Sequence, residues 1–321
     1  MSKIRNCWLI VILFCFSFFV IASAVLAAES YSIEESTVSH KRLIVGAALK
    51  KYKPPKRKQC DINVPAQYAT IQTAIDAAVN GDTVCVGKGT YNENVSINKS
   101  IQLSGRGASK TIINGQITNE VPGNYTILLD KNNITVEGFY IKGMGDDRGD
   151  TTIGTTDGSR SGTKIRYNQI VAGNGELAVR LDGYQTNNLF QNNVFEGNES
   201  PQVVWVGDGE NVDFLNNTFI GTVPTSSPYF GDILVDDASS SMIKQNVFNV
   251  TGIIRSIVMA SWPSVINENN LNSDSTGKIY NYPAGGVLNA ENNWWGDLDP
   301  SDNIQGDVDF TPFVLSPFPE N

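Results

Sequence analysis

The stretch FQNNVFEG, residues 190–197, returns as FLNNTF at 214–219 and as IKQNVF at 243–248. Every copy has an asparagine two residues before a large apolar residue. The same spacing recurs in IRYNQI, in INENNL and, more loosely, in AENNWW. Successive asparagines of the pattern are 25, 24, 29, 23 and 24 residues apart, and they are Asn168, Asn193, Asn217, Asn246, Asn269 and Asn293.

This period predicts a solenoid, because it runs through short stretches of β-branched and aromatic residues separated by Gly, Asn and Ser. In a parallel β-solenoid each coil stacks on the previous one at about 4.8 Å, so equivalent residues lie one above another. An inward asparagine can then bond its amide to the asparagine of the next coil, which satisfies a polar group that is costly to bury. We interpret the repeated asparagine as an architectural ladder and its apolar partner as core.

A short helix is predicted ahead of the first coil, in the stretch TIQTAIDAAVNGD that begins at residue 70. Its apolar residues fall on one helical face, and Gly81 stands where a C-terminal cap is expected. An amphipathic helix here can cover the open end of the solenoid. The residues of the apolar face are Ile71, Ala74, Ile75, Ala78 and Val79.

The N-terminus has the pattern of a secretory signal, residues 1–28. Lys3 and Arg5 precede an apolar run that closes on small residues, which predicts cleavage after Ala27 or Ala28. The mature chain is then secreted or held at the cell surface or in the periplasm, with no membrane span. A retained anchor is the alternative, since the run is near the roughly 20 residues that span a bilayer.

Charge divides the remaining chain into two parts. Residues 29–59 carry eight basic and three acidic residues and predict a basic linker, either a solvated tether or a contact to anionic lipid or wall polymer. From Cys60 onward there are 14 basic and 30 acidic residues, a net charge of −16. Nucleic acid is excluded as a partner because it requires a basic surface. We expect the β-helix domain over residues 60–313 and a tail over 314–321, in a monomeric protein.

Only Cys60 and Cys85 remain once the signal is removed. A pair of cysteines in an exported protein predicts one disulfide bond, and two buried free thiols are the alternative.

Three further stretches are informative, namely YATIQTAIDAAVNGDTVCVGKGTYNENVSI, SIQLSGRGASKTIING and NNWWGDLDPSDNIQGDVDFTPF. They resemble the right-handed parallel β-helix proteins of the pectin-lyase-like superfamily. With the asparagine-containing coils, the resemblance covers about residues 61–313. It implies an all-β fold, a single-stranded right-handed parallel β-helix with a short N-terminal capping α-helix. It is weakly specific for activity, because the superfamily includes lyases, hydrolases, esterases and surface proteins without known activity.

Known catalytic patterns are incomplete. The one histidine, His40, lies in the linker, which excludes a Ser-His-Asp triad, a histidine base and histidine-rich metal sites in the domain. VDD at 235–237 is similar to the paired aspartates of polygalacturonases, but their Gly-His-Gly element is missing. The N-terminal part is most similar to pectin methylesterases, yet their Asp-Phe-Ile-Phe-Gly and Arg-Pro-Trp elements are missing.

The candidate site comes from the spacing of acidic residues. Counting back from the ladder asparagines places Asp182, Asp208 and Asp236 or Asp237 near one another on successive coils. Such a column could hold Ca²⁺ through Asp182, Asp208 and Asp236, or supply the paired carboxylates of a glycosidase. The alternative is that these aspartates are ordinary turn residues at strand ends.

Three further residues complete this candidate site. Arg180 and Trp205 lie on the same strands as the aspartates and could offer a cation and a sugar-stacking ring. Tyr229, in the loop VPTSSPYF at 223–230, could contact substrate from the side of a groove.

The sequence thus favours an exported surface or envelope protein that contacts extracellular polysaccharide without a complete catalytic motif. The alternative is a polysaccharide lyase or glycosidase, possibly Ca²⁺-dependent, that uses Arg180, Asp182, Asp208, Asp236 and Asp237. The acidic domain would repel pectate or alginate unless Ca²⁺ bridged protein and polymer. This repulsion makes a lyase the less favoured of the two functions.

Overall fold

A computed structural model of the chain describes residues 41–52, 59–117, 124–145, 151–173, 177–197, 203–221, 231–235, 238–250, 255–259, 264–272, 278–281, 286–296 and 298–319. The predicted signal, Tyr229, Asp236 and Asp237 lie outside these residues. By its internal contacts the chain divides into residues 1–47 and residues 48–321. In the described part no helix combines the length and the apolar character needed to cross a bilayer.

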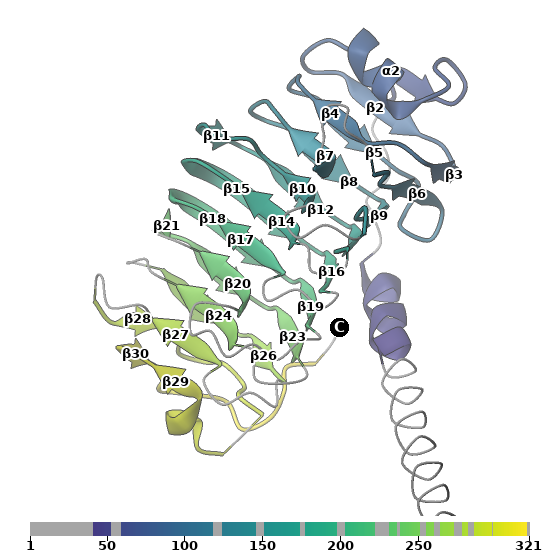
Figure 1. Ribbon diagram of the computed structural model, residues 1–321. Coiled ribbons are helices and arrows are strands. Elements are labelled where there is room, and N and C mark those ends of the chain that lie inside the picture. Colours follow the sequence, from purple (N-terminus) through teal and green to yellow (C-terminus); the bar gives the residue numbers. More distant parts are fainter. Residues whose placement is uncertain are drawn as a thin grey trace, which may run out of the picture. The chain divides into compact units, whose positions relative to one another are not determined.

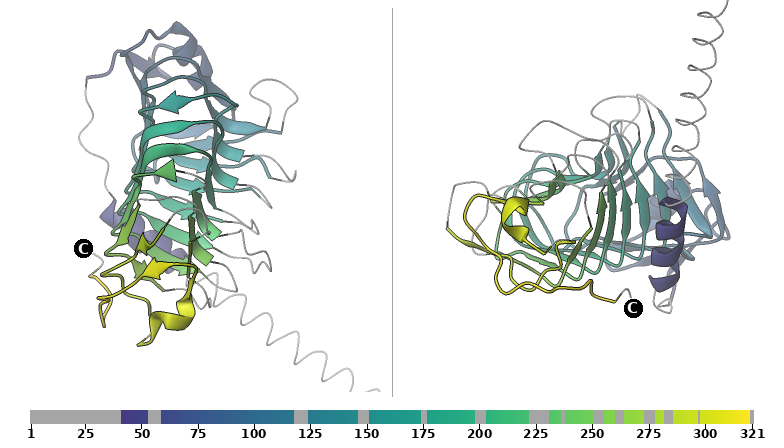
Figure 2. Two further views of the ribbon diagram at one scale, coloured as in Figure 1. Left: turned by 90° about the vertical axis from the view of Figure 1, so that its left-hand side faces the viewer. Right: turned by 90° about the horizontal axis from the view of Figure 1, so that it is seen from below.

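The described residues between 60 and 319 form a right-handed parallel β-solenoid in which every pair of neighbouring strands is parallel (Figure 1). The strands form three sheets, which Figure 2 shows from two further sides. The 13-stranded sheet holds β1 (Ile62–Val64), β2 (Thr83–Val86), β5 (Gln102–Ser104), β8 (Thr135–Glu137), β11 (Arg160–Ser161), β12 (Lys164–Arg166), β15 (Gln185–Gln191), β18 (Gly209–Leu215), β21 (Ala238–Ser239), β22 (Met242–Lys244), β25 (Val265–Asn267), β28 (Leu288–Asn289) and β30 (Val308–Asp309).

The nine-stranded sheet holds β4 (Val95–Ile97), β7 (Tyr125–Leu129), β10 (Thr151–Gly154), β14 (Leu177–Leu181), β17 (Val204–Val206), β20 (Gly231–Val235), β24 (Arg255–Met259), β27 (Ile279–Asn281) and β29 (Ile304–Gln305). The eight-stranded sheet holds β3 (Gly89–Tyr91), β6 (Thr111–Asn114), β9 (Tyr140–Lys142), β13 (Gln169–Val171), β16 (Val194–Glu196), β19 (Thr218–Gly221), β23 (Val247–Val250) and β26 (Asn270–Leu271). The described helices are residues 41–51, α2 (Ile71–Ala77) and the 3-10 turn η1 (Pro300–Asn303).

The predicted asparagine ladder is confirmed. Asn193 donates from Nδ2 to Oδ1 of Asn217 at 3.1 Å, and Asn217 donates likewise to Asn246 at 3.0 Å. The same bond joins all six asparagines from Asn168 to Asn293. The residue before each of them has a positive φ of 56–59°, which turns the chain sharply between the 13-stranded and eight-stranded sheets; these residues are Tyr167, Asn192, Asn216, Gln245, Glu268 and Asn292.

The apolar residues of the repeat stack inside the coils, as predicted. The rings of Phe190 and Phe214 are 4.6 Å apart and nearly parallel. A second stack places Phe195, Phe219 and Phe248 at 5.0 and 4.8 Å from one another in turn. All five rings are buried, so equivalent positions of successive coils fill the core with equivalent side chains.

Helix α2 lies at the N-terminal end of the solenoid, next to β2 and β4 (Figure 1). Its own residues Ile71 and Ile75 are buried against the solenoid. Both carboxylate oxygens of Glu93 accept backbone N–H groups of the first turn of α2. The predicted helix end was wrong. Val79 is 65% exposed, because the helix stops at Ala77 and the Asp82 carboxylate accepts the Val79 N–H at 2.8 Å.

The outer face of the eight-stranded sheet is buried at β16, β19 and β23. Its outward residues Val194, Thr218 and Val247 are at most 6% exposed. The Asn270 side chain bonds both backbone groups of Phe318, at 2.8 and 3.0 Å, and so holds the C-terminal tail. Tyr52, which follows the helix formed by residues 41–51 within the predicted linker, shares a hydrogen bond of 3.1 Å with Thr218.

The disulfide between Cys60 and Cys85 is confirmed, with the two Cα atoms 5.6 Å apart. It joins Cys60, two residues before β1, to Cys85 in β2 and closes a loop with a sequence separation of 25 residues. Constraining such a loop in the unfolded chain stabilises the fold by about 3 kcal/mol.

Replacing both cysteines with serine is therefore expected to lower the free energy of unfolding by about 3 kcal/mol. Urea denaturation with and without reductant measures this change. Reductant should destabilise the wild-type protein and leave the double variant unaffected. Equal stability of both proteins would contradict the prediction.

Candidate functional site

Arg180 and Trp205 occupy equivalent positions on adjacent coils of the nine-stranded sheet. The register pairs Arg180 of β14 with Trp205 of β17, and with Gly154 of β10 on the other side. Arg180 has its guanidinium carbon 5.1 Å from the centroid of the Trp205 ring, which is the geometry of a cation–π contact. Residues before and after each of them point inward, so both side chains lie on the outer face. The structure thus places the predicted cation, Arg180, next to the predicted sugar-stacking ring of Trp205.

Asp182 joins this pair. It follows Arg180 by two residues, on the same face, and its two carboxylate oxygens lie 3.1 and 3.0 Å from the Arg180 Nε. The Arg180 side chain is 42% exposed, whereas that of Asp182 is 12% exposed. The aspartate therefore fixes the orientation of the Arg180 guanidinium, which remains accessible to solvent.

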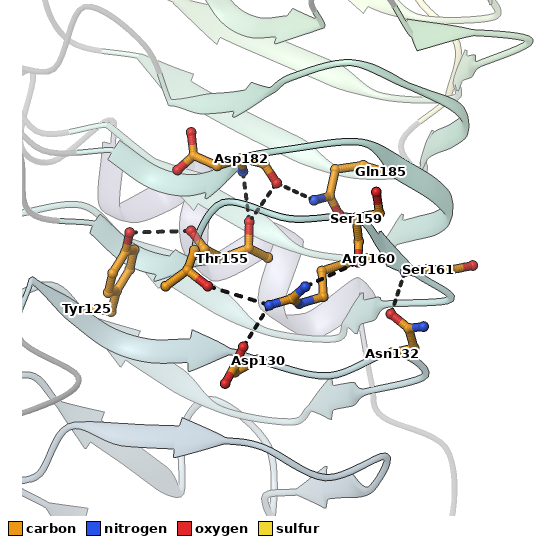
Figure 3. A network of polar contacts seen from close by, with 10 residues as sticks. Tyr125, Asp130, Asn132, Thr155, Ser159, Arg160, Ser161, Asp182 and Gln185 are labelled. Carbon is orange, nitrogen blue, oxygen red and sulfur yellow. Dashed lines mark hydrogen bonds and ion pairs between the residues drawn. The ribbon is translucent and has the colours of Figure 1, made fainter.

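The backbone of Asp182 is held by two neighbours, shown in Figure 3. Its N–H donates to Thr155 Oγ1 at 2.7 Å, and its carbonyl oxygen accepts from Thr155 at 3.1 Å. The Gln185 amide donates to the same carbonyl at 2.5 Å. Thr155 and Gln185 are buried, so the turn that follows β14 is fixed within the fold.

Tyr125 is a further residue of this face, and the sequence interpretation missed it. Its hydroxyl donates to the carbonyl of Thr155 at 3.3 Å (Figure 3). Its ring lies beside Gly154, where a Cβ atom would come within 2.5 Å of the ring. Burial raises the pKa of the Tyr125 phenol, and the nearby charge of Asp182 raises it further, against a smaller opposing effect of Arg180. The phenol therefore stays protonated at neutral pH and acts as a hydrogen-bond donor.

A second ion pair lies in the turns beside these residues. Arg160, at the start of β11, bonds Asp130 at 2.7 Å (Figure 3). It also reaches Thr156 Oγ1 at 3.5 Å. The side chain of Asp130 is 46% exposed, and that of Arg160 is 16% exposed. The turns that border the site thus carry a charged pair that spans two coils.

The predicted aspartates occupy different positions of their turns. Leu181 pairs with Val206, but Gln185 pairs with Gly209, so residues 182–184 of one coil stand opposite residues 207–208 of the next. Asp182 is buried and bonded to Arg180, whereas Asp208 is exposed. Asp236, Asp237 and Tyr229 lie outside the described residues, so their roles stay predictions.

A metal site is also a prediction only. Within the described ranges no three Asp, Glu, His or Cys side chains gather closely enough to share a metal ion. The proposed Ca²⁺ ligand Asp236 is not among those residues.

Comparisons with known proteins agree with this geometry at the level of fold. No protein-family model matches the chain. A cell surface glycoprotein of Methanothermus fervidus is 36% identical over 85 residues, which is 26% of this chain and 13% of the relative. The chain therefore spans about one eighth of the length of that protein.

Solved structures share the architecture at low identity. A pectin methylesterase in complex with a hexasaccharide is 13% identical with a TM-score of 0.52, covering 78% of this chain and 93% of its own. The alginate lyase of Paenibacillus sp. str. FPU-7 is 13% identical with a TM-score of 0.51, covering 74% and 95%. The pectin methylesterase of Aspergillus niger is 15% identical with a TM-score of 0.50, covering 83% and 94%. The chain thus has the parallel β-helix fold that these solved structures share.

Proposed function

We propose that this is an exported cell-surface protein that binds extracellular polysaccharide on the outer face of its nine-stranded sheet, without turning it over. The observation that carries the proposal is the contact of Arg180 with Trp205 on adjacent coils, beside Tyr125. We call these three residues the outer-face platform. They place two aromatic rings and a cation along the direction in which the coils stack.

The fold leaves this platform available to a polymer. The solenoid core is filled by the ladder and by stacked apolar residues, so only outward side chains can meet a ligand. Aromatic rings with a few fixed polar groups are the usual lining of sites for sugars and other small molecules. The name of the M. fervidus relative, a cell surface glycoprotein, supports a location at the cell surface.

The contacts around the platform favour binding over catalysis. The Asp182 carboxylate is bonded to Arg180, which reduces its capacity to act as a general base. The raised pKa of Tyr125 keeps its phenol protonated, whereas a lyase base must be deprotonated. The alternative remains a Ca²⁺-dependent lyase or glycosidase that uses Arg180 with Asp182, Asp208 and Asp236 or Asp237.

Replacing Trp205 with alanine is expected to weaken glycan binding by about tenfold or more, since it removes both the ring and its contact with Arg180. The measurement is a glycan panel with and without Ca²⁺ that records retention, reducing ends and unsaturated products together. Met242→Ala is the matched control, because Met242 is 40% exposed on the 13-stranded sheet. Product formation would favour the enzyme alternative. Equal binding by the Trp205 and Met242 variants would overturn the assignment of the binding site to the platform.

A further inference from the structure

We infer that the polysaccharide bound by the outer-face platform is uncharged, a polymer of neutral hexoses rather than a polyuronate. The inference rests on the proposed function and specifies its ligand. Three observations carry it: the pairing of Arg180, the charges on the surrounding turns and the groups that the platform offers to a sugar.

The cation of the platform already has an anionic partner. Both oxygens of Asp182 lie within 3.1 Å of the Arg180 Nε, and the Asp182 side chain is 12% exposed. If a uronate paired with the Arg180 guanidinium in place of Asp182, the buried Asp182 carboxylate would lose its counter-charge, which is unfavourable. Arg180 is therefore poorly suited to recognise a carboxylate in every sugar unit.

The surrounding segments add negative charge. The described strands and following turns at 125–131, 151–160, 177–184, 204–210 and 231–235 contain six acidic and three basic residues. Among the described residues, Asp157 and Asp208 are exposed, and the basic residue Arg160 is bonded to Asp130. The domain from Cys60 onward has a net charge of −16. A polyanion approaching this face meets repulsion at long and short range.

The groups that remain suit a neutral sugar. Trp205 and Tyr125 present apolar ring surface, and each ring lies beside a glycine, Gly207 and Gly154; at Gly154 the missing side chain makes room for the Tyr125 ring. The exposed Arg180 guanidinium can donate to sugar hydroxyl groups, and the Tyr125 oxygen, whose proton is donated to the Thr155 carbonyl, can accept from one. Such contacts do not require charge on the ligand.

The test compares three polymers by affinity electrophoresis of the full mature chain: a neutral hexan, polygalacturonate and chitosan. Ionic strength is varied from about 0.02 to 0.5 M, over which exposed charges become screened. Neutral hexan is expected to bind with little salt dependence, and polygalacturonate at least about tenfold more weakly. Tighter binding of polygalacturonate or chitosan that fades with salt would overturn the inference while the proposed function stands. Binding of none of the three would overturn both.

An Asp182→Asn variant sharpens the test, since it keeps the shape of the side chain and removes its charge. The ratio of polygalacturonate to hexan binding is expected to rise about tenfold, because Arg180 then lacks its anionic partner. Asp307→Asn, which removes one exposed charge near the C-terminal end of the domain, is the matched control and should leave the ratio unchanged. An unchanged ratio in the Asp182 variant would overturn the role given to this ion pair.

Discussion

Replacing Asn217 with alanine is expected to lower the free energy of unfolding by about 4 kcal/mol. Its Oδ1 accepts the backbone N–H of Asn193 at 2.9 Å, and its Nδ2 donates to the carbonyl of Phe190 at 2.9 Å. Both partners are buried, and alanine supplies neither a donor nor an acceptor. Each buried backbone group left unpaired costs about 1–3 kcal/mol, and the bonds to the neighbouring ladder amides are lost in addition.

Urea denaturation followed by circular dichroism measures this change. Asn98→Ala is the control, because Asn98 is an exposed asparagine after β4 and its replacement should change stability by less than about 0.5 kcal/mol. Similar small changes in the two variants would show that the ladder adds little to stability.

Gly209→Ala is expected to destabilise the protein by about 3 kcal/mol or more. A Cβ atom at this position would lie 1.9 Å from the carbonyl oxygen of Gln185, its partner in the β15–β18 register. The clash is with backbone, so it cannot be relieved by rotating a side chain. The strands would have to separate where the coil enters the 13-stranded sheet.

Gly207→Ala, on the same coil, is the matched control for this prediction. The nearest atoms to a Cβ there are 3.4 Å away or more, which is ordinary contact. Thermal unfolding of the two variants side by side should show a large loss for Gly209→Ala and a small one for Gly207→Ala. Equal losses of stability in the two variants would mean that replacing any glycine with alanine destabilises this coil, and that the predicted clash with Gln185 is not the cause.

The fold could be predicted because the ladder repeats one chemical requirement on every coil. Each asparagine marks the same turn, so its spacing gives the period and its apolar partner gives the core. The earlier coils lack this marker. Phe139 stands at the ladder position before Asn168 and takes part only through its backbone N–H, which donates to the Asn168 amide at 3.0 Å. Without an asparagine to set the phase, the position of Tyr125 on that coil relative to Arg180 could not be predicted.

The candidate site was predicted in part for a related reason. Arg180 and Trp205 align because both lie within strands, whose register is regular. Asp182 and Asp208 lie in turns of three and two residues, so counting back from the ladder asparagines shifts one against the other. Sequence spacing therefore locates strand residues well, and turn residues only where turn length is constant.

The ladder also limits how a chain of this kind can change in length. Each ladder asparagine from Asn168 to Asn269 donates to the amide oxygen of the following coil and to a carbonyl of the preceding one, so these coils present their neighbours with the same set of partners. Duplication of one complete coil would reproduce these partners and leave the existing bonds intact. Loss of a single residue within a strand would instead exchange its inward and outward faces. Gene duplication in units of about 24 residues is thus the route by which such a protein can grow without refolding.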